Sequence, residues 1–150
     1  VSVWLYNDRR ELFVCECLYL LSSDVFEKGA ILKAGDYPRY FASTEDDLTV
    51  SAHDARNDPR TSEFTEGYLV SLQITSMMDV PIRLDGRVIG VVCHEHVGDP
   101  RRWSTSEEDF AAFIANYVSL SYAASRCKSA LEQLARVSRE LKKLRARMEE

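Results

Sequence analysis

The sequence predicts an α+β domain built on a central antiparallel sheet of five to six strands, with helices on both faces and a long C-terminal helix that extends as a coiled coil. Three observations carry this prediction. Apolar residues alternate with period two in several segments, Asp85–Gly86 joins two of them as a hairpin turn, and a heptad pattern begins at Leu120. The 150 residues, 45% of them hydrophobic, fit one domain with a core.

The N-terminal segments are predicted to form a strand hairpin. Residues 1–6, VSVWLY, place apolar and mixed side chains on alternate faces, and residues 12–21 are rich in β-branched, aromatic and apolar types. We expect the two segments to pair across the turn NDRRE. Residues 22–35 favour a loop, with one short extended piece at residues 30–33.

The middle of the chain predicts two helices around a short strand. Asp36 is a suitable N-cap for a helix that reaches about Asp46, with Pro38 in its first turn. Residues 48–52, LTVSA, favour a short strand. Asp58–Pro59 then predicts the start of a second helix that continues to about Leu72.

Two further strands, MMDVPIRL and RVIGVVCHEHV, should pair through Asp85–Gly86. A strict two-residue turn would place Met78 opposite Cys93 and would mismatch the two faces of the sheet. A three-residue loop with a glycine bulge shifts the register and removes this conflict, so we predict that loop.

The last helix is predicted to begin at a capping box, Ser104 to Glu107, and to continue to the end of the chain. Its first part packs on the domain, and its heptads then predict a coiled-coil homodimer, with a single helix folded on its own domain as the alternative. The expected interface residues are Leu120, Cys127, Leu134, Val137, Leu141, Leu144 and Met148. The domain then covers residues 1–125, and the coiled-coil signalling helix covers residues 126–150.

Charge is unevenly distributed along the chain. The net charge is −5, with about +4 in residues 126–150 and about −9 in the remainder. An acidic body argues against a nucleic-acid-binding domain, and the apolar runs are too short to cross a bilayer. We therefore expect no nucleic-acid partner and no membrane contact from this segment.

Four segments carry a family resemblance: VSVWLYN, DARNDPR, GYLVSLQITSMMDVPIRLDGRVIGVVCHEH and PRRWSTSEEDFAAFIANYVSLSYA. Together with the order of elements, they resemble a GAF domain, the small-molecule-sensing module of bacterial signal-transduction proteins and phytochromes. The resemblance implies a GAF/PAS-like fold of the phytochrome-like superfamily. The first helix usual in this family is absent from the sequence, as are the motifs that attach a bilin.

The resemblance also implies a function. We expect a non-catalytic, cytoplasmic sensory domain that binds a small molecule or dimerises. It would relay a signal through its C-terminal helix to an output domain in the same chain, such as a histidine kinase of a two-component system or a diguanylate cyclase. A ligand-free dimerisation scaffold is one alternative, and a metal or redox sensor using Cys93 and the nearby histidines is another. The sequence identifies no cofactor.

The motif CHEH, residues 93–96, holds four residue types that bind metals or transfer protons. Side chains alternate along a strand, so Cys93 and Glu95 should face one side and His94 and His96 the other. Only two of the four could then converge on one ion, whereas zinc sites use three or four protein ligands. We predict no metal centre and no catalytic centre in this motif.

The resemblance implies a pocket between one face of the sheet and the middle helices. The implied ligand-binding residues are Trp4, Tyr6, Tyr40, Phe64, Tyr68, Met77, Asp79, Val91, Cys93 and Glu95. Asp79 and Glu95 would share this face, and a buried carboxylate without a partner is costly. Their partner could be a cationic or hydrogen-bond-donating ligand, an internal arginine such as Arg60, or water.

Overall fold

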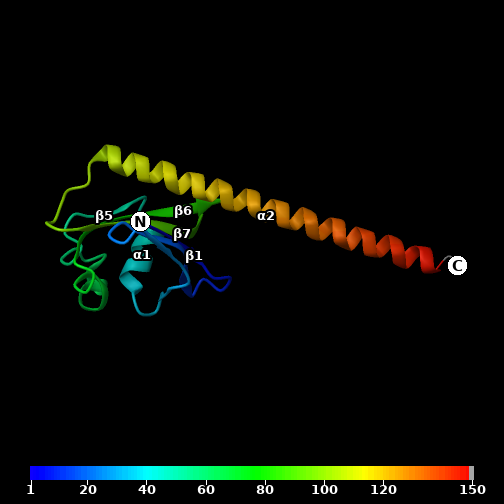
Figure 1. The fold of residues 1–150 in the computed structure, drawn as a ribbon, viewed down its shortest axis with the longest axis horizontal. Helices are drawn as coiled ribbons and strands as arrows, with labels where there is room; N and C mark the ends of the chain where they lie inside the picture. Colours follow the sequence, from blue (N-terminus) through cyan, green and yellow to red (C-terminus); the bar gives the residue numbers. More distant parts are fainter. Residues whose placement is uncertain (149–150) are drawn as a thin grey trace.

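The computed structural model describes residues 1–148 and has the predicted α+β architecture (Figure 1). Its strands are β1 (Ser2–Tyr6), β2 (Leu12–Leu20), β3 (Val25–Glu27), β4 (Ile31–Lys33), β5 (Val50–Ala52), β6 (Ile74–Leu84) and β7 (Arg87–Val97). They form one sheet in the order β3-β2-β1-β7-β6-β5, and β4 also pairs with β2. All the pairs are antiparallel.

Helices cover both faces of this sheet, as predicted. The helix α1 (Pro38–Asp46), the 3₁₀ turn η1 (Ser62–Phe64) and the π-helical turn η2 (Thr65–Leu69) cover one face. The helix α2 (Thr105–Met148) crosses the other face and then continues well beyond the sheet (Figure 1).

The core between the sheet and α2 is aliphatic and closely packed. Its buried residues are Met78, Val80, Ile82, Val92, Ala111 and Ala115. The two alanines lie four residues apart on α2, and their small side chains let the helix approach the sheet closely. The predicted capping box is present, because the Ser104 amide donates to Oε2 of Glu107 at 2.9 Å.

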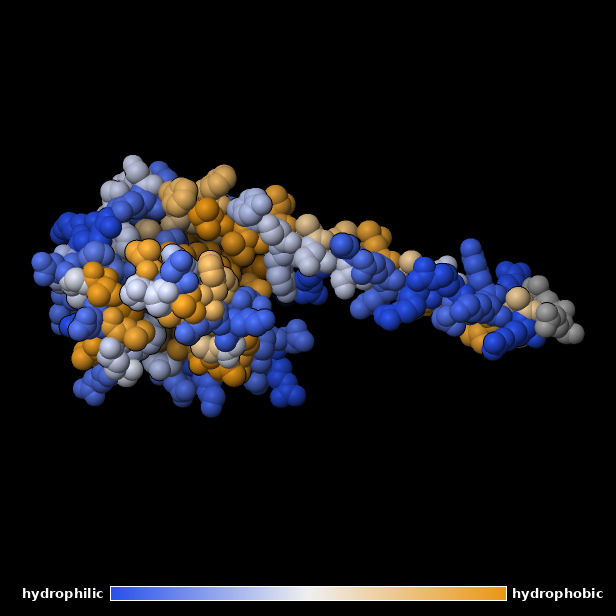
Figure 2. Space-filling model, viewed as in Figure 1, coloured by the Kyte–Doolittle hydropathy of each residue, from blue (hydrophilic) through white to orange (hydrophobic). Residues whose placement is uncertain are grey.

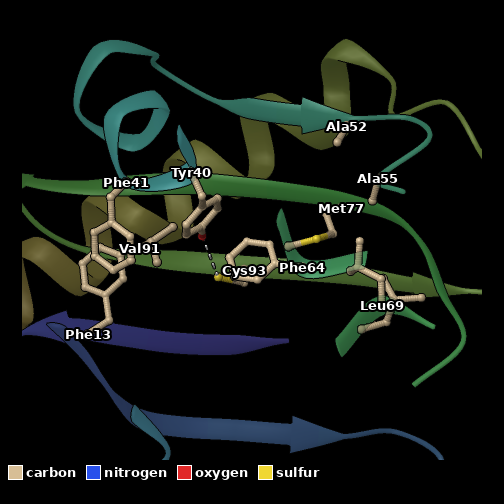
Figure 3. Close-up of a cluster of buried hydrophobic side chains, with 11 residues drawn as sticks. Phe13, Tyr40, Phe41, Ala52, Ala55, Phe64, Leu69, Met77, Val91 and Cys93 are labelled. Carbon is tan, nitrogen blue, oxygen red and sulfur yellow. Dashed lines mark hydrogen bonds between the residues drawn. The ribbon is translucent and has the colours of Figure 1, made fainter. Parts of the chain in front are cut away.

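The core on the opposite face is larger and richer in aromatic residues (Figure 3). Its buried residues are Phe13, Tyr40, Phe41, Ala52, Ala55, Phe64, Leu69, Ile74, Met77, Val91 and Cys93. Figure 3 shows Tyr40 pointing from α1 toward Cys93 on the sheet. Successive residues of β6 and β7 therefore serve two different cores.

The register between β6 and β7 places Asp79 opposite Cys93, as the face assignment requires. The predicted origin of this register, a three-residue loop with a glycine bulge, was wrong. Leu84 pairs with Arg87, so Asp85–Gly86 is a two-residue turn, and both residues have positive φ. The shift arises instead at a bulge, where Arg83 pairs with Val88 but Ile82 pairs with Gly90.

Gly90, beside this bulge, occupies a position that only glycine fits. A Cβ atom there would collide with the carbonyl oxygen of Trp4 and with the Leu5 side chain on β1. The close approach of β7 to β1 therefore depends on the missing side chain.

Three local predictions for residues 22–72 were wrong. Asp36 does not cap α1, whose N-cap is Tyr37 without a side-chain cap. The second helix from Asp58–Pro59 to Leu72 is replaced by the short turns η1 and η2. The expected loop at residues 22–35 contains β3 as well as the extended piece, so the sheet has seven strands within the described residues.

The distal part of α2 has no contact with the sheet in the single chain. The predicted interface residues Leu134 and Leu141 are 66% and 61% exposed. The described part of the predicted 126–150 segment, up to Met148, is helical, and residues 149–150 lie outside the described residues. Between residues 1 and 148, no helix contains a stretch both long and apolar enough to span a bilayer.

Candidate ligand-binding site

A cavity of about 270 Å³ lies between the sheet and the α1–η2 layer. Its walls come from strands β1, β4, β6 and β7 and from the segment between α1 and η2. The lining residues are Trp4, Ala30, Ile31, Leu32, Tyr37, Tyr40, Phe64, Gly67, Tyr68, Met77, Val91, Cys93 and Glu95. Ile31 and Gly67 are exposed and lie at the rim.

The structure places most of the sequence-implied ligand residues around this cavity. Those that line it are Trp4, Tyr40, Phe64, Tyr68, Met77, Val91, Cys93 and Glu95. Tyr6 and Asp79 do not line it. Tyr6 packs instead against Phe13, with ring centroids 4.2 Å apart, and donates its hydroxyl to Glu45.

Asp79 is completely buried beneath the cavity. Its Oδ2 accepts a hydrogen bond of 2.7 Å from the Tyr40 hydroxyl, and its Oδ1 has no partner among the described residues. Burial raises the pKa of Asp79 to about 7, against the opposing effect of the Tyr40 hydrogen bond, and the nearby charge of Glu95 adds to the rise. The suggested partner Arg60 is elsewhere, bound to Asp58 at 2.8 Å.

Glu95 is half-buried on the wall of the cavity. Its Oε1 accepts a hydrogen bond of 2.7 Å from the Tyr68 hydroxyl, whereas its Oε2 has no partner in the part of the chain that the structure describes. Burial raises the pKa of Glu95, and the Tyr68 hydrogen bond opposes this rise. Each of the two carboxyl groups on this face is therefore held by one tyrosine.

Cys93 lies between these groups, with its Sγ 3.8 Å from the Tyr40 hydroxyl. Burial, together with the charges of Asp79 and Glu95, raises the pKa of the Cys93 thiol well above its usual value. The thiol is therefore held in its protonated form, which is a poor nucleophile.

The histidines of the CHEH motif do not reach Cys93. The Nδ1 of His94 lies 3.1 Å from the carbonyl oxygen of Met78, toward the α2 face. The third histidine of the chain, His53, accepts the amide hydrogen of Trp103 at its Nδ1. Within residues 1–148, no three His, Cys, Asp or Glu side chains form a group able to hold a metal ion.

Aromatic rings form the wall opposite the sheet. The ring of Phe64 contacts those of Tyr37 and Tyr40, with centroids 4.4 and 4.7 Å away, and the ring of Tyr68 is 6.3 Å away. Trp4 lies on the sheet side, and its indole N–H donates to the Ser2 hydroxyl at 2.8 Å. The cavity is therefore bounded by aromatic rings and by a small number of polar groups.

The sequence interpretation missed five lining residues: Ala30, Ile31, Leu32, Tyr37 and Gly67. The extended piece at residues 30–33 was anticipated, but its place over the cavity depends on the pairing of β4 with β2. No local pattern gives that pairing. Tyr37 was identifiable, since it precedes Tyr40 by three residues at the start of α1.

A second, open depression of about 690 Å³ lies between α2, β6 and residues 46–49. Its lining includes Asp46, Asp47, Glu108 and Asp109, together with Arg60 and Arg83. Buried apolar residues, among them Val80 and Ala115, form its floor, but charged side chains surround it and it is open to solvent, so it encloses a ligand less well than the first cavity.

Comparison with known proteins gives a consistent result. Residues 1–122 match the family model described as GAF domain. A GAF domain from a phosphoenolpyruvate-protein phosphotransferase of Coxiella burnetii aligns with a TM-score of 0.64 and 21% identity, covering 86% of this chain and 74% of that one. No curated protein matches this sequence.

Two further similar structures come from two-component systems. A domain of a putative sensor histidine kinase from Sinorhizobium meliloti aligns with a TM-score of 0.64 at 17% identity, covering 87% of this chain and 83% of that one. The GAF domain of a sensor histidine kinase from Bacillus halodurans aligns with a TM-score of 0.63 at 16% identity, covering 85% and 83%. At these identities the likeness shows a shared fold.

Proposed function

Because the chain belongs to the GAF domain family, we propose that it is a non-catalytic sensory domain that binds a small molecule in the cavity between the sheet and α1–η2. It dimerises through α2 and relays ligand binding along that helix to an output domain, such as a histidine kinase or a diguanylate cyclase. This role places the domain in the cytoplasm, where such outputs act.

The observation that carries this proposal is the sharing of β6 and β7 between the cavity and α2. Met77 and Cys93 line the cavity, whereas their neighbours Met78 and Val92 pack in the core against α2. A ligand that shifts these strands by a small amount must also shift the surface on which α2 rests. Closely packed cores transmit such displacements because they have little free volume.

A small-molecule library tests the sensory role. Thermal unfolding of the purified domain is expected to shift upward with at least one compound, because a ligand that binds only the folded state stabilises it. Val91→Trp is the matched control, since a large side chain placed in the cavity wall should remove that shift. A library without any shift, in a domain that native mass spectrometry shows to carry no ligand, would contradict the sensory role.

An exposed apolar stripe on α2 supports the dimer. Phe110, Phe113, Tyr117 and Leu120 are each more than 60% exposed although they lie beside the domain. The stripe continues with Leu131, also exposed, into the predicted heptad positions. Spacings of three and four residues from Phe110 to Leu120 keep these side chains on one face of the helix, as in a coiled-coil seam. Figure 2 shows hydrophobic surface at intervals along the part of α2 that extends beyond the domain.

The dimer is tested by the double variant Leu134→Asp with Leu141→Asp. Its mass in solution, measured by light scattering, is expected to fall to that of one chain, because two buried charges would disrupt the seam. The matched control is Ala135→Asp with Ala146→Asp, which places the same charges on the same helix away from the stripe. An unchanged mass in the first variant would contradict the dimer.

Among the alternatives, the ligand-free scaffold is supported by the same exposed stripe and requires no occupied cavity. It predicts a stable dimer that no compound affects. The geometry gives less support to a metal or redox sensor, because Cys93 is buried as a thiol and His94 points toward the opposite face.

A further inference from the structure

We propose that the cavity binds a small organic ammonium ion, a protonated amine carried on a compact apolar or aromatic frame. This inference rests on the proposed sensory function and names the chemical class of the ligand. It follows from the polar groups, the charges, the aromatic walls and the size of the site.

The charged hydrogen-bonding groups left free at the site are acceptors, and they lie beside the neutral hydroxyl of Tyr37 and the thiol of Cys93. The side-chain donors of Trp4, Tyr40 and Tyr68 are committed to Ser2, Asp79 and Glu95 respectively. Oε2 of Glu95 on the wall remains without a partner in the described residues, whereas the unpartnered Oδ1 of Asp79 is buried beneath the wall and does not line the cavity. A carboxylate oxygen only accepts, so the ligand that satisfies it must donate.

The charges of the site also favour a cationic ligand. Glu95 is the only acidic side chain on the wall, and no lysine, arginine or histidine of the described chain lines the cavity. An anionic ligand would be placed against Glu95 and above Asp79 in a partly desolvated space, which is strongly unfavourable. A cation would compensate the two acidic groups that the fold leaves without a basic partner.

The aromatic wall suits the same ligand. The rings of Tyr37, Tyr40, Phe64 and Tyr68 line one side, and Trp4 lies on the sheet side. Their π-faces carry negative electrostatic potential and attract organic cations, as in the aromatic cages that bind ammonium groups. They also supply apolar contact for the carbon frame that carries the amine.

The volume sets the size of the ligand. About 270 Å³ equals the liquid volume of about nine water molecules and lies just below the usual range for drug-sized ligands. The site therefore fits a compact amine better than a nucleotide or a tetrapyrrole.

Three probes that share one phenyl ring and a short chain test the charge preference. They are 2-phenylethylammonium, the neutral 2-phenylethanol and the anionic 3-phenylpropanoate, each titrated into the domain by calorimetry and by ligand-observed NMR. We expect the ammonium probe to bind at least about tenfold more tightly than the alcohol, a difference of about 1.4 kcal/mol, and the anion to show no binding.

Glu95→Gln keeps the size and one acceptor of the side chain but removes its charge, so it should abolish the preference for the ammonium probe. Glu16→Gln, on the exposed part of β2, is the matched control and should retain it. Tyr68→Phe should also retain it, because it keeps the Glu95 carboxylate. The unfolding midpoint of each variant verifies that it is folded.

Each other outcome overturns the inference. Equal binding of the alcohol or the anion, a preference that survives Glu95→Gln, or no binding of any probe at about 10 mM would each do so. The outcomes also separate the two proposals. If neutral or anionic compounds bind in the cavity, the sensory function stands without the ammonium ligand, whereas a cavity that binds no compound of any charge removes both.

Discussion

The two faces of the sheet are built from alternate residues of the same strands, yet they differ in chemistry. The α2 face is filled by Val80, Ile82 and Val92 against the two buried alanines of α2. The opposite face carries bulky aromatic rings, a cavity of about 270 Å³ and the carboxyl groups of Asp79 and Glu95. The second face combines a cavity with two carboxyl groups that have no basic partner, which packing alone does not explain.

The α2 face therefore contributes mainly to stability, and the opposite face carries the proposed ligand site. A closely packed aliphatic layer stabilises the fold through burial and dispersion. A cavity and a buried acid both lower the free energy of unfolding, and such costs are concentrated at functional sites.

Ile82→Ala and Met77→Ala remove a comparable side chain from each face of β6. Ile82 is fully buried in the packed layer, so its loss should lower the free energy of unfolding by about 4 kcal/mol. Met77 borders the existing cavity and already lacks neighbours on one side, so about 2 kcal/mol is expected. Urea unfolding measures both values, and equal losses would show that the two faces are equally well packed.

Asp79→Asn tests how much the buried carboxyl group lowers the free energy of unfolding. The pH dependence of that free energy is the quantity to compare. The pKa of Asp79 rises from 3.8 to about 7 on folding, so the folded state holds this proton more tightly than the unfolded chain. Stability must then fall as the pH rises through this interval, by about 3 kcal/mol between about pH 5 and pH 8.

The asparagine variant cannot lose this proton. Its free energy of unfolding, measured in urea across the same pH range, should therefore lack that part of the decline. Parallel curves for the variant and the natural protein would show that Asp79 titrates normally.

The two faces also differ in how far the sequence predicted them. Alternation in β6 and β7 placed Cys93 and Glu95 together and placed His94 on the other side, because side-chain direction in a strand is a local property. The heptads and the capping box similarly predicted α2, whose start depends on Ser104 and Glu107, three residues apart.

What the sequence did not predict depends on contacts between distant residues. The bulge at Ile89 arises where β7 adapts to both β1 and β6, so no turn residue signals it. The cap of α1 comes from Glu63 rather than from Asp36, and the tyrosine partners of the acids come from α1 and η2. Local sequence therefore predicted the sheet side of the site but only part of its cover.

Tyr40→Phe and Tyr68→Phe compare two carboxyl groups on the cavity face that are buried to different extents. Tyr40→Phe leaves the Asp79 carboxyl without its hydrogen bond in a fully buried position, so a loss of about 2 kcal/mol is expected. Glu95 is only half-buried and can bind water instead, so Tyr68→Phe should cost less than about 1 kcal/mol.

Chemical unfolding at neutral pH measures both losses. The Asp79→Asn background provides the control, because the effect of Tyr40→Phe should be smaller once the residue beneath it is uncharged. An unchanged effect in that background would mean that Tyr40 contributes through packing alone.

The smallest effect concerns the helices that cover the two faces. The N-terminus of α1 is capped from a distance by Glu63, whose Oε2 accepts the amides of Arg39 and Tyr40 at 3.0 and 3.1 Å. Glu63→Gln removes the negative charge at this helix start and should cost about 1 kcal/mol. Glu107→Gln at α2 is the matched change, and it should cost less because glutamine also serves in a local capping box and the ion pair with Arg101 that it loses is exposed to solvent. Hydrogen exchange should show faster opening of α1 alone in the Glu63 variant. The reason is that the Glu63 carboxylate connects α1 to η1, whereas the cap of α2 comes from its own first turn. Equal exchange in α1 with and without Glu63 would mean that this cover is held by its aromatic contacts only.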